Sequence, residues 1–102
     1  MFLSQYGGKT YWSISMYLII VYDIKVERVN KVKSFLRQNL FWVQNSVFEG
    51  EVTKSEYLNI ESGLNDIINI NEDSIIMYKF RTDDMMQKEI LGIEKSPIGE
   101  IL

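Results

Sequence analysis

The side chains of this chain that could do chemistry are mainly carboxylates, because the sequence contains no histidine and no cysteine. Imidazole general bases, thiol nucleophiles and metal sites built on Cys or His are therefore excluded. A metal ion, if one is bound, must rest on oxygen ligands. Such ligands favour hard cations, so the expected cofactor is Mg2+ or Mn2+.

Asp23 is the carboxylate best placed for such chemistry, because it directly follows the apolar run Tyr17–Tyr22. A strand over that run would hold the Asp23 backbone rigidly and leave its carboxylate at the rim of a sheet, which suits a metal ligand. An aspartate in this position could instead cap the following helix by accepting amide hydrogen bonds. Asp83 and Asp84 are further acids, but adjacent aspartates in a predicted linker are typical of solvated positions.

The elements that position Asp23 follow from hydrophobic patterning. The continuous apolar run Tyr17–Tyr22 predicts a strand buried on both faces, at the centre of a sheet. Apolar residues at helical spacing then predict a helix over about Val26–Asn39. Phe41–Val52 is rich in aromatic and β-branched residues and predicts strand structure interrupted at a point that the sequence does not determine.

The second half of the chain repeats the helix and strand pattern. Thr53-Lys-Ser-Glu56 has the form of a capping box and predicts the start of a second helix. Gly63 within that helix should cost about 1 kcal/mol relative to alanine. A polar turn at Asn71–Asp73 precedes a strand over Ser74–Phe80. The order predicts an α+β, ferredoxin-like βαββαβ fold, with both helices on one face of an antiparallel sheet.

The 102 residues suffice for one domain, which we expect over residues 16–80. Residues 1–15 are interpreted as an N-terminal extension, either a tag or an upstream start. Residues 81–102 are expected to make dimer or partner contacts through Met85-Met86 and through the apolar end Ile98–Leu102, which is predicted to dock as a strand on the partner subunit of a homodimer. The apolar runs are too short to span a bilayer and resemble no signal peptide, so a cytoplasmic location is expected.

Charge is distributed unevenly, although the net charge is only −3. The first predicted helix and its start carry five basic residues against Glu27 alone: Lys25, Arg28, Lys31, Lys33 and Arg37. Such a surface could bind nucleic acid phosphates, with Arg28 as the best candidate, and that binding would weaken as salt rises. The same residues could equally lay their stems along the apolar stripe and keep their charges in water.

Several stretches together resemble the CRISPR-associated Cas-two family in their order, their spacing and their amino-acid identities, over about residues 16–80. They are Met16-Tyr-Leu-Ile-Ile-Val-Tyr-Asp23, Arg28-Val29, Trp42-Val-Gln-Asn-Ser-Val-Phe-Glu-Gly-Glu51 and Glu72-Asp-Ser-Ile-Ile-Met-Tyr78. The resemblance implies a homodimer that bridges two dimers of the Cas-one integrase and contacts the duplex of the incoming DNA. Many members of that family are also described as metal-dependent endonucleases acting on single-stranded RNA or double-stranded DNA.

The resemblance also implies roles for particular residues. Asp23 would hold the metal together with its symmetry mate, and Tyr22, Arg28 and Phe48 match other positions that the family associates with catalytic activity. Trp42 is a departure, because many members carry arginine there. By residue type alone, Phe48 and Trp42 belong to the core or to a dimer seam.

Three functional hypotheses follow. The leading one is a DNA-binding, dimeric scaffold for spacer acquisition, in which the integrase performs the transesterification. The alternative is a magnesium-dependent endonuclease that hydrolyses phosphodiester bonds of single-stranded RNA or double-stranded DNA through paired Asp23 carboxylates. A ribonuclease toxin of the virulence-associated D type, which shares the fold, is the third.

Overall fold

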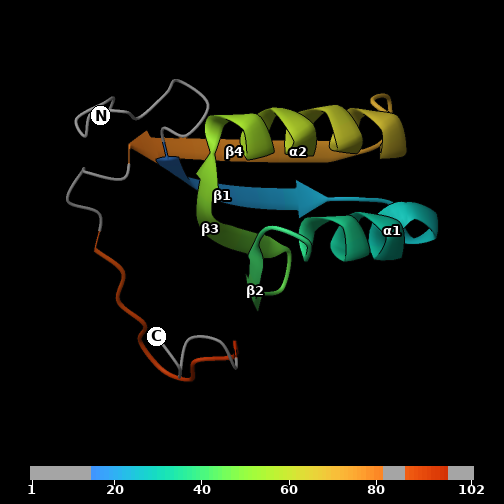
Figure 1. Cartoon of the computed structure of the whole chain (residues 1–102). Coiled ribbons are helices and arrows are strands. Elements are labelled where there is room, and N and C mark those ends of the chain that lie inside the picture. The colour runs from blue at the N-terminus through green and yellow to red at the C-terminus, as the bar shows by residue number, and fades with distance from the viewer. Residues whose placement is uncertain (1–14, 82–86, 97–102) are drawn as a thin grey trace, which may run out of the picture.

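The computed structural model describes residues 15–81 and 87–96 of the chain. The elements in chain order are β1 (Ser15–Asp23), α1 (Val26–Leu36), β2 (Phe41–Gln44), β3 (Val47–Thr53), α2 (Lys54–Ile67) and β4 (Ser74–Arg81) (Figure 1). The predicted order is confirmed. Residues 1–14, the acids Asp83 and Asp84, the pair Met85-Met86 and the end Ile98–Leu102 lie outside the described residues.

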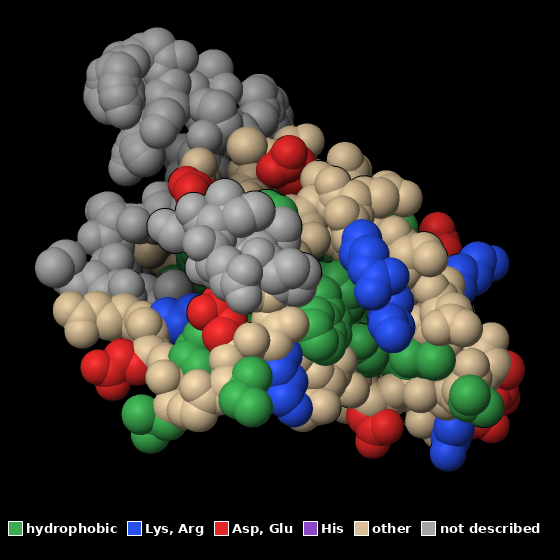
Figure 2. Space-filling model, turned by 90° about the horizontal axis from the view of Figure 1, so that it is seen from below, with side chains coloured by type: hydrophobic (Ala, Val, Ile, Leu, Met, Phe, Trp, Pro, Cys, Tyr) green, Lys and Arg blue, Asp and Glu red, His purple; other side chains and the backbone are tan. Residues whose placement is uncertain are grey.

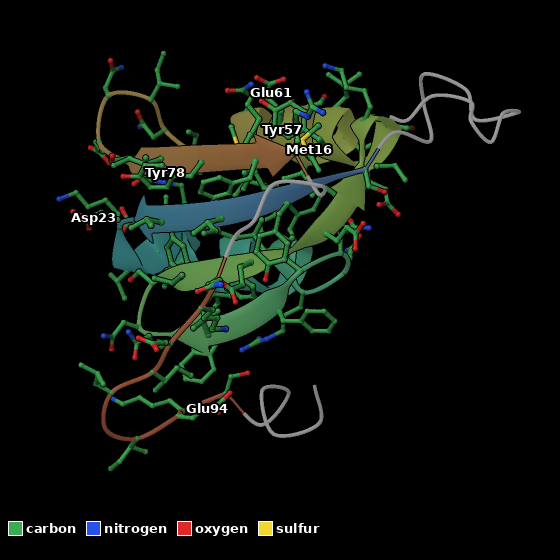
Figure 3. The ribbon with its side chains drawn as sticks, turned by 90° about the vertical axis from the view of Figure 1, so that its left-hand side faces the viewer. Met16, Asp23, Tyr57, Glu61, Tyr78 and Glu94 are labelled. Carbon is green, nitrogen blue, oxygen red and sulfur yellow. The ribbon has the colours of Figure 1, made fainter. Side chains whose placement is uncertain are left out.

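The strands form an antiparallel sheet in the order β2-β3-β1-β4, so β1 lies in the interior of the sheet as predicted. Ile20 on β1 pairs with Phe48 on β3 and with Met77 on β4. Figure 3 shows the strands side by side with the helices behind them. This is the predicted ferredoxin-like βαββαβ arrangement, with one face of the sheet covered by helices.

The core lies between the sheet and the helices. Alternate residues of β1 are buried on this side, and they are Leu18, Ile20 and Tyr22. The residues between them, including Ile19 and Val21, are only half-buried. Within one chain, β1 is therefore buried on one face and not on both as its apolar run predicts. The face of the sheet that carries Ile19 and Val21 is here named the open face.

Local signals account for the boundaries of the elements. The capping box is confirmed, because the Glu56 backbone N–H donates to Thr53 Oγ1 at 3.0 Å and the Thr53 N–H donates to Glu56 Oε1 at 2.9 Å. The interruption between β2 and β3 falls at Asn45, whose φ of 43° suits a tight turn. Helix α1 ends at Leu36, before the predicted Asn39, because the following residues form a turn. In residues 87–96 the structure contains no strand.

Gly63 brings helix α2 close to helix α1. A Cβ at this position would lie 2.1 Å from Cζ of Phe35 and 2.6 Å from its Cε1. The Phe35 ring therefore occupies the space that any larger side chain would need. A glycine inside a helix lowers the stability of that helix. Here the missing side chain leaves the space that the Phe35 ring fills.

We expect Gly63→Ala to lower the free energy of unfolding by up to about 2 kcal/mol, because overpacking costs about 1–3 kcal/mol and alanine regains about 1 kcal/mol of helix propensity. Urea unfolding measures this difference. Ser62→Ala on the exposed side of the same helix is the control and should be neutral or slightly stabilising. A Gly63→Ala protein as stable as the Ser62→Ala protein would contradict the prediction.

Candidate functional site

Asp23 is the last residue of β1 and pairs with Ser74, the first residue of β4. Its side chain is exposed, and Figure 3 shows it at the tip of the strand. Within the described residues, its carboxylate has no hydrogen bond and no ion pair. The helix-capping alternative is not observed, because Lys25 is the N-cap of α1 and no side chain caps that helix.

A metal site on Asp23 cannot be completed by one chain in the part that the structure describes. No group of three or more acidic side chains in that part is arranged to hold a metal ion. An exposed carboxylate without a protein partner is nonetheless the donor type that Mg2+ prefers, and Mg2+ commonly keeps several of its waters. Asp23 is therefore a suitable ligand for such an ion, provided that a second copy of the chain supplies a second carboxylate.

Tyr22 and Phe48 lie in the core below the end of β1. Their ring centroids are 6.0 Å apart, Phe48 is fully buried and Tyr22 is 5% exposed. Burial raises the pKa of the Tyr22 phenol, and the charge of Arg37 offsets this only in part. The phenol therefore stays protonated at neutral pH, and the location of both residues favours packing beneath Asp23 over contact with a substrate.

Arg28 is engaged by acidic side chains near the start of β4. Its Nε donates to Asp73 Oδ2 at 2.6 Å, its Nη2 donates to Asp73 Oδ1 at 3.1 Å, and the same Nη2 donates to Glu72 Oε1 at 2.8 Å. Glu27 adds a longer ion pair at 3.7 Å. These contacts raise the pKa of the guanidinium further, so Arg28 is always charged. Most of its directional donors are therefore already used within the chain.

Asp73 is a functional candidate that the sequence reasoning did not single out. Its side chain is fully buried, and the Arg28 guanidinium beside it holds the pKa of the carboxyl well below its usual range. Backbone N–H groups of Asn69 and Lys25 add to this effect. The sequence shows only a polar turn at this point, and nothing in a local pattern connects Asp73 to Arg28, 45 residues earlier.

The other basic residues of α1 are placed differently from Arg28. Lys31 and Arg37 are exposed and Lys33 is half-buried. Among the described residues, none of the three makes a side-chain hydrogen bond or an ion pair. Figure 2 shows Lys and Arg side chains beside apolar ones on the half of the molecule where α1 lies. These charges are therefore available to an anionic partner.

Apolar side chains gather on the open face of the sheet. Ile76 and Tyr78 on β4 are 47% and 50% exposed, and they pair across the sheet with Val21 and Ile19. Figure 3 shows Tyr78 on β4 and Asp23 at the end of β1, and Tyr78 is paired with Ile19, four residues before Asp23. The helices leave this apolar surface uncovered, and it ends beside Asp23.

Glu49 interrupts the apolar character of the open face. It is 8% exposed and forms an ion pair with Lys88. Burial, together with the charge of Glu49, raises the pKa of Tyr17 to about 12. The segment that contains Lys88 continues past Val43 and Gln44 of β2, with which it lines a pocket.

No helix in the described part of the chain is long and apolar enough to cross a membrane.

The profile of the family described as "CRISPR associated protein Cas2" matches residues 16–88 of this chain. A protein of Pyrococcus furiosus named "CRISPR-associated endoribonuclease Cas2" is 61% identical over 87 residues, which cover 85% of this chain and 100% of that protein. A protein of Methanocaldococcus jannaschii with the same name is 60% identical over 88 residues, which cover 86% of this chain and 77% of that protein.

A solved structure described as "Crystal structure of cas2" superimposes with a TM-score of 0.73 at 43% identity, covering 81% of this chain and 93% of that one. The sequence match and the fold therefore agree, and they do not support the hypothesis of a virulence-associated toxin. The family resemblance inferred from the sequence is confirmed. This chain belongs to the CRISPR associated protein Cas2 family.

Proposed function

We propose that this chain is a homodimeric, metal-dependent endoribonuclease in which Asp23 and its symmetry mate hold one Mg2+ or Mn2+ ion. The observation that carries the proposal is the exposed Asp23 carboxylate, which ends a rigid strand and has no partner within the described residues. The relatives named as endoribonucleases support the same reaction. Single-stranded RNA is the proposed substrate, with double-stranded DNA as the second substrate to be compared.

The homodimer is supported by the open face. Ile76 and Tyr78 are half exposed in one chain, although they belong to an apolar surface of the kind that dimer interfaces bury. A two-fold axis through such a face pairs each residue with its copy. Because Asp23 ends the strand next to this face, a dimer whose two-fold axis runs along β1 would bring two Asp23 carboxylates to one end of the interface.

The chemistry can be divided between the ion and the chain. A bound divalent ion polarises a phosphoryl oxygen and lowers the pKa of its bound water. Asp23 supplies the negative ligand, and the packing of Tyr22 against Phe48 stabilises the strand end that carries it. The chain itself has no histidine, and the Tyr22 phenol stays protonated. Hydrolysis in this site therefore does not require a protein base.

Metal removal tests this function directly. We expect purified protein to cleave single-stranded RNA in Mg2+ or Mn2+ and to lose cleavage in EDTA, with recovery when the metal is restored. Ca2+ serves as the control cation, because its flexible coordination at longer distances suits this hydrolysis poorly. Cleavage that persists unchanged in EDTA would contradict the metal-dependent mechanism.

A second function is supported by the exposed cations of α1. Lys31 and Arg37 are available to phosphates, and a dimer would present two such helices. We propose that the dimer also binds double-stranded DNA and bridges the Cas-one integrase during spacer acquisition.

With the cognate integrase, a short duplex and a CRISPR-repeat target, wild type and Asp23→Ala should stimulate integration equally. Stimulation by wild type alone would show that this role needs the carboxylate. Both functions agree with the expected cytoplasmic location.

The exposed cations predict a salt-dependent loss of DNA binding. Combined Lys31→Ala and Arg37→Ala should weaken duplex binding and reduce the slope of log K against log salt by about 1.8 per chain, since each phosphate that a side chain neutralises contributes about 0.9. Fluorescence anisotropy over a salt series measures both quantities. Lys95→Ala, which removes an exposed cation of the C-terminal segment, is the control. A slope equal to that of wild type would show that α1 does not contact the duplex.

A further inference from the structure

We infer that Asp73 is a positioning residue that fixes the loop after Asp23 and thereby holds the Asp23 carboxylate at the rim of the sheet. The inference rests on the proposed function, in which Asp23 ligates the metal. It concerns the protein around that ligand, and it assigns Arg28 to the same positioning network.

The contacts of Asp73 connect three separate parts of the chain. Oδ1 accepts a hydrogen bond from the Lys25 backbone N–H at 2.9 Å and from Arg28 Nη2 at 3.1 Å. Oδ2 accepts from Arg28 Nε at 2.6 Å and from the Asn69 backbone N–H at 2.8 Å. Both oxygens are thus bonded twice. One buried carboxylate joins the turn after α2, the loop after β1 and the first turn of α1.

The location of Asp73 explains why these contacts bear on Asp23. Ser74, the next residue in the chain, pairs with Asp23 across the sheet. Lys25, which Asp73 binds, lies two residues after Asp23. Asp23 is therefore held by the β4 ladder on one side and by the Lys25 contact on the other. Without the second contact, the chain could rotate about Ile24 and move the end of β1.

The start of α1 depends on this distant carboxylate. Helix N-termini usually gain stability from the side chain of a local cap residue, but the N-cap here is Lys25 and provides no such bond. Asp73 instead binds the backbone of Lys25 and the side chain of Arg28, in the first turn of the helix. The paired donors of an arginine fix direction as well as distance. The network is therefore built to orient the loop.

Glu72 offers a matched control. It also binds Arg28, at 2.8 Å, but its side chain is 48% exposed and, among the described residues, makes no hydrogen bond to the loop. An exposed ion pair of this kind contributes little to stability. Asp73→Asn and Glu72→Gln each remove one negative charge beside the Arg28 guanidinium. Only Asp73→Asn also replaces an acceptor oxygen of the network that reaches Lys25 with an NH2 donor, which faces other donors.

The experiment compares these variants with wild type and Asp23→Ala as full-length protein, using Mn2+ as the probe. Calorimetry measures Mn2+ affinity, and NMR measures amide hydrogen exchange of Asp23 and Lys25 without metal. Asp73→Asn should bind Mn2+ about 10-fold more weakly, the lower end of the effect of losing a group bonded directly to a ligand, because Asp73 acts on Asp23 only through the backbone. It should also exchange the Lys25 amide faster, whereas Glu72→Gln should match wild type in both measurements.

Each outcome decides between the two proposals. Folded Asp73→Asn with wild-type Mn2+ affinity and wild-type Lys25 exchange would overturn the positioning role. Equal Mn2+ binding by wild type and Asp23→Ala would overturn the proposed metal site, while the exchange measurement would still decide whether Asp73 fixes the loop. If Asp73→Asn does not fold, Arg28→Lys keeps the charge, loses the paired donors and should give the same two changes in weaker form.

Discussion

Replacing Asp23 with alanine is expected to reduce metal-dependent RNA cleavage by more than about 100-fold, because loss of an outer-shell partner alone commonly costs about 10–100-fold and Asp23 is a direct ligand. In a two-fold dimer, one substitution removes both carboxylates from the site. The fold should not suffer, because the Asp23 side chain is exposed and makes no hydrogen bond within the described residues. Initial rates on single-stranded RNA in saturating Mg2+ measure the loss.

Asp66→Ala is the matched control for this substitution. Asp66 is likewise an exposed acid, but it lies on helix α2 and not on the strand that carries Asp23. The two variants change net charge equally and should have the same thermal stability. If Asp23→Ala cleaves RNA within a few-fold of Asp66→Ala, then Asp23 is not the ligand and the nuclease proposal is wrong.

Ile76→Glu is expected to convert the dimer to monomer and to abolish cleavage with it. Ile76 is 47% exposed in one chain and lies on the open face, where the proposed interface would bury it. A carboxylate placed there would lose its water without gaining a partner. Substitution of a central interface residue commonly costs at least about 2 kcal/mol, so association should weaken by about 30-fold or more. Sedimentation over a concentration series measures the dissociation constant.

Leu58→Glu separates this effect from a general loss of stability. Leu58 is 45% exposed, almost the same as Ile76, but it lies on helix α2 and not on the sheet. The Leu58→Glu protein should therefore remain dimeric and active. Dimerisation of Ile76→Glu with wild-type affinity would show that the subunits associate through another surface, and the pairing of Asp23 carboxylates would then need a different geometry.

The elements of this protein could be predicted because their signals are local. A capping box joins Thr53 to Glu56, three residues apart, and the apolar run of β1 needs no information from the rest of the chain. The sequence also indicated Asp23, because a carboxylate directly after such a run lies where the strand ends. The predicted end of α1 was wrong by a few residues, and the predicted burial of β1 on both faces was wrong within one chain.

The tertiary structure decided the roles that depend on distant neighbours. Arg28 resembles the other cations of α1 in the sequence, but folding brings it to Asp73, 45 residues away, so its donors are engaged within the chain while the exposed Lys31 is available to an anionic partner. Gly63 likewise acquires its meaning only from Phe35 on another helix. Periodicity and capping act over a few residues, whereas the partner of a charge and the space around a side chain are set by packing between elements.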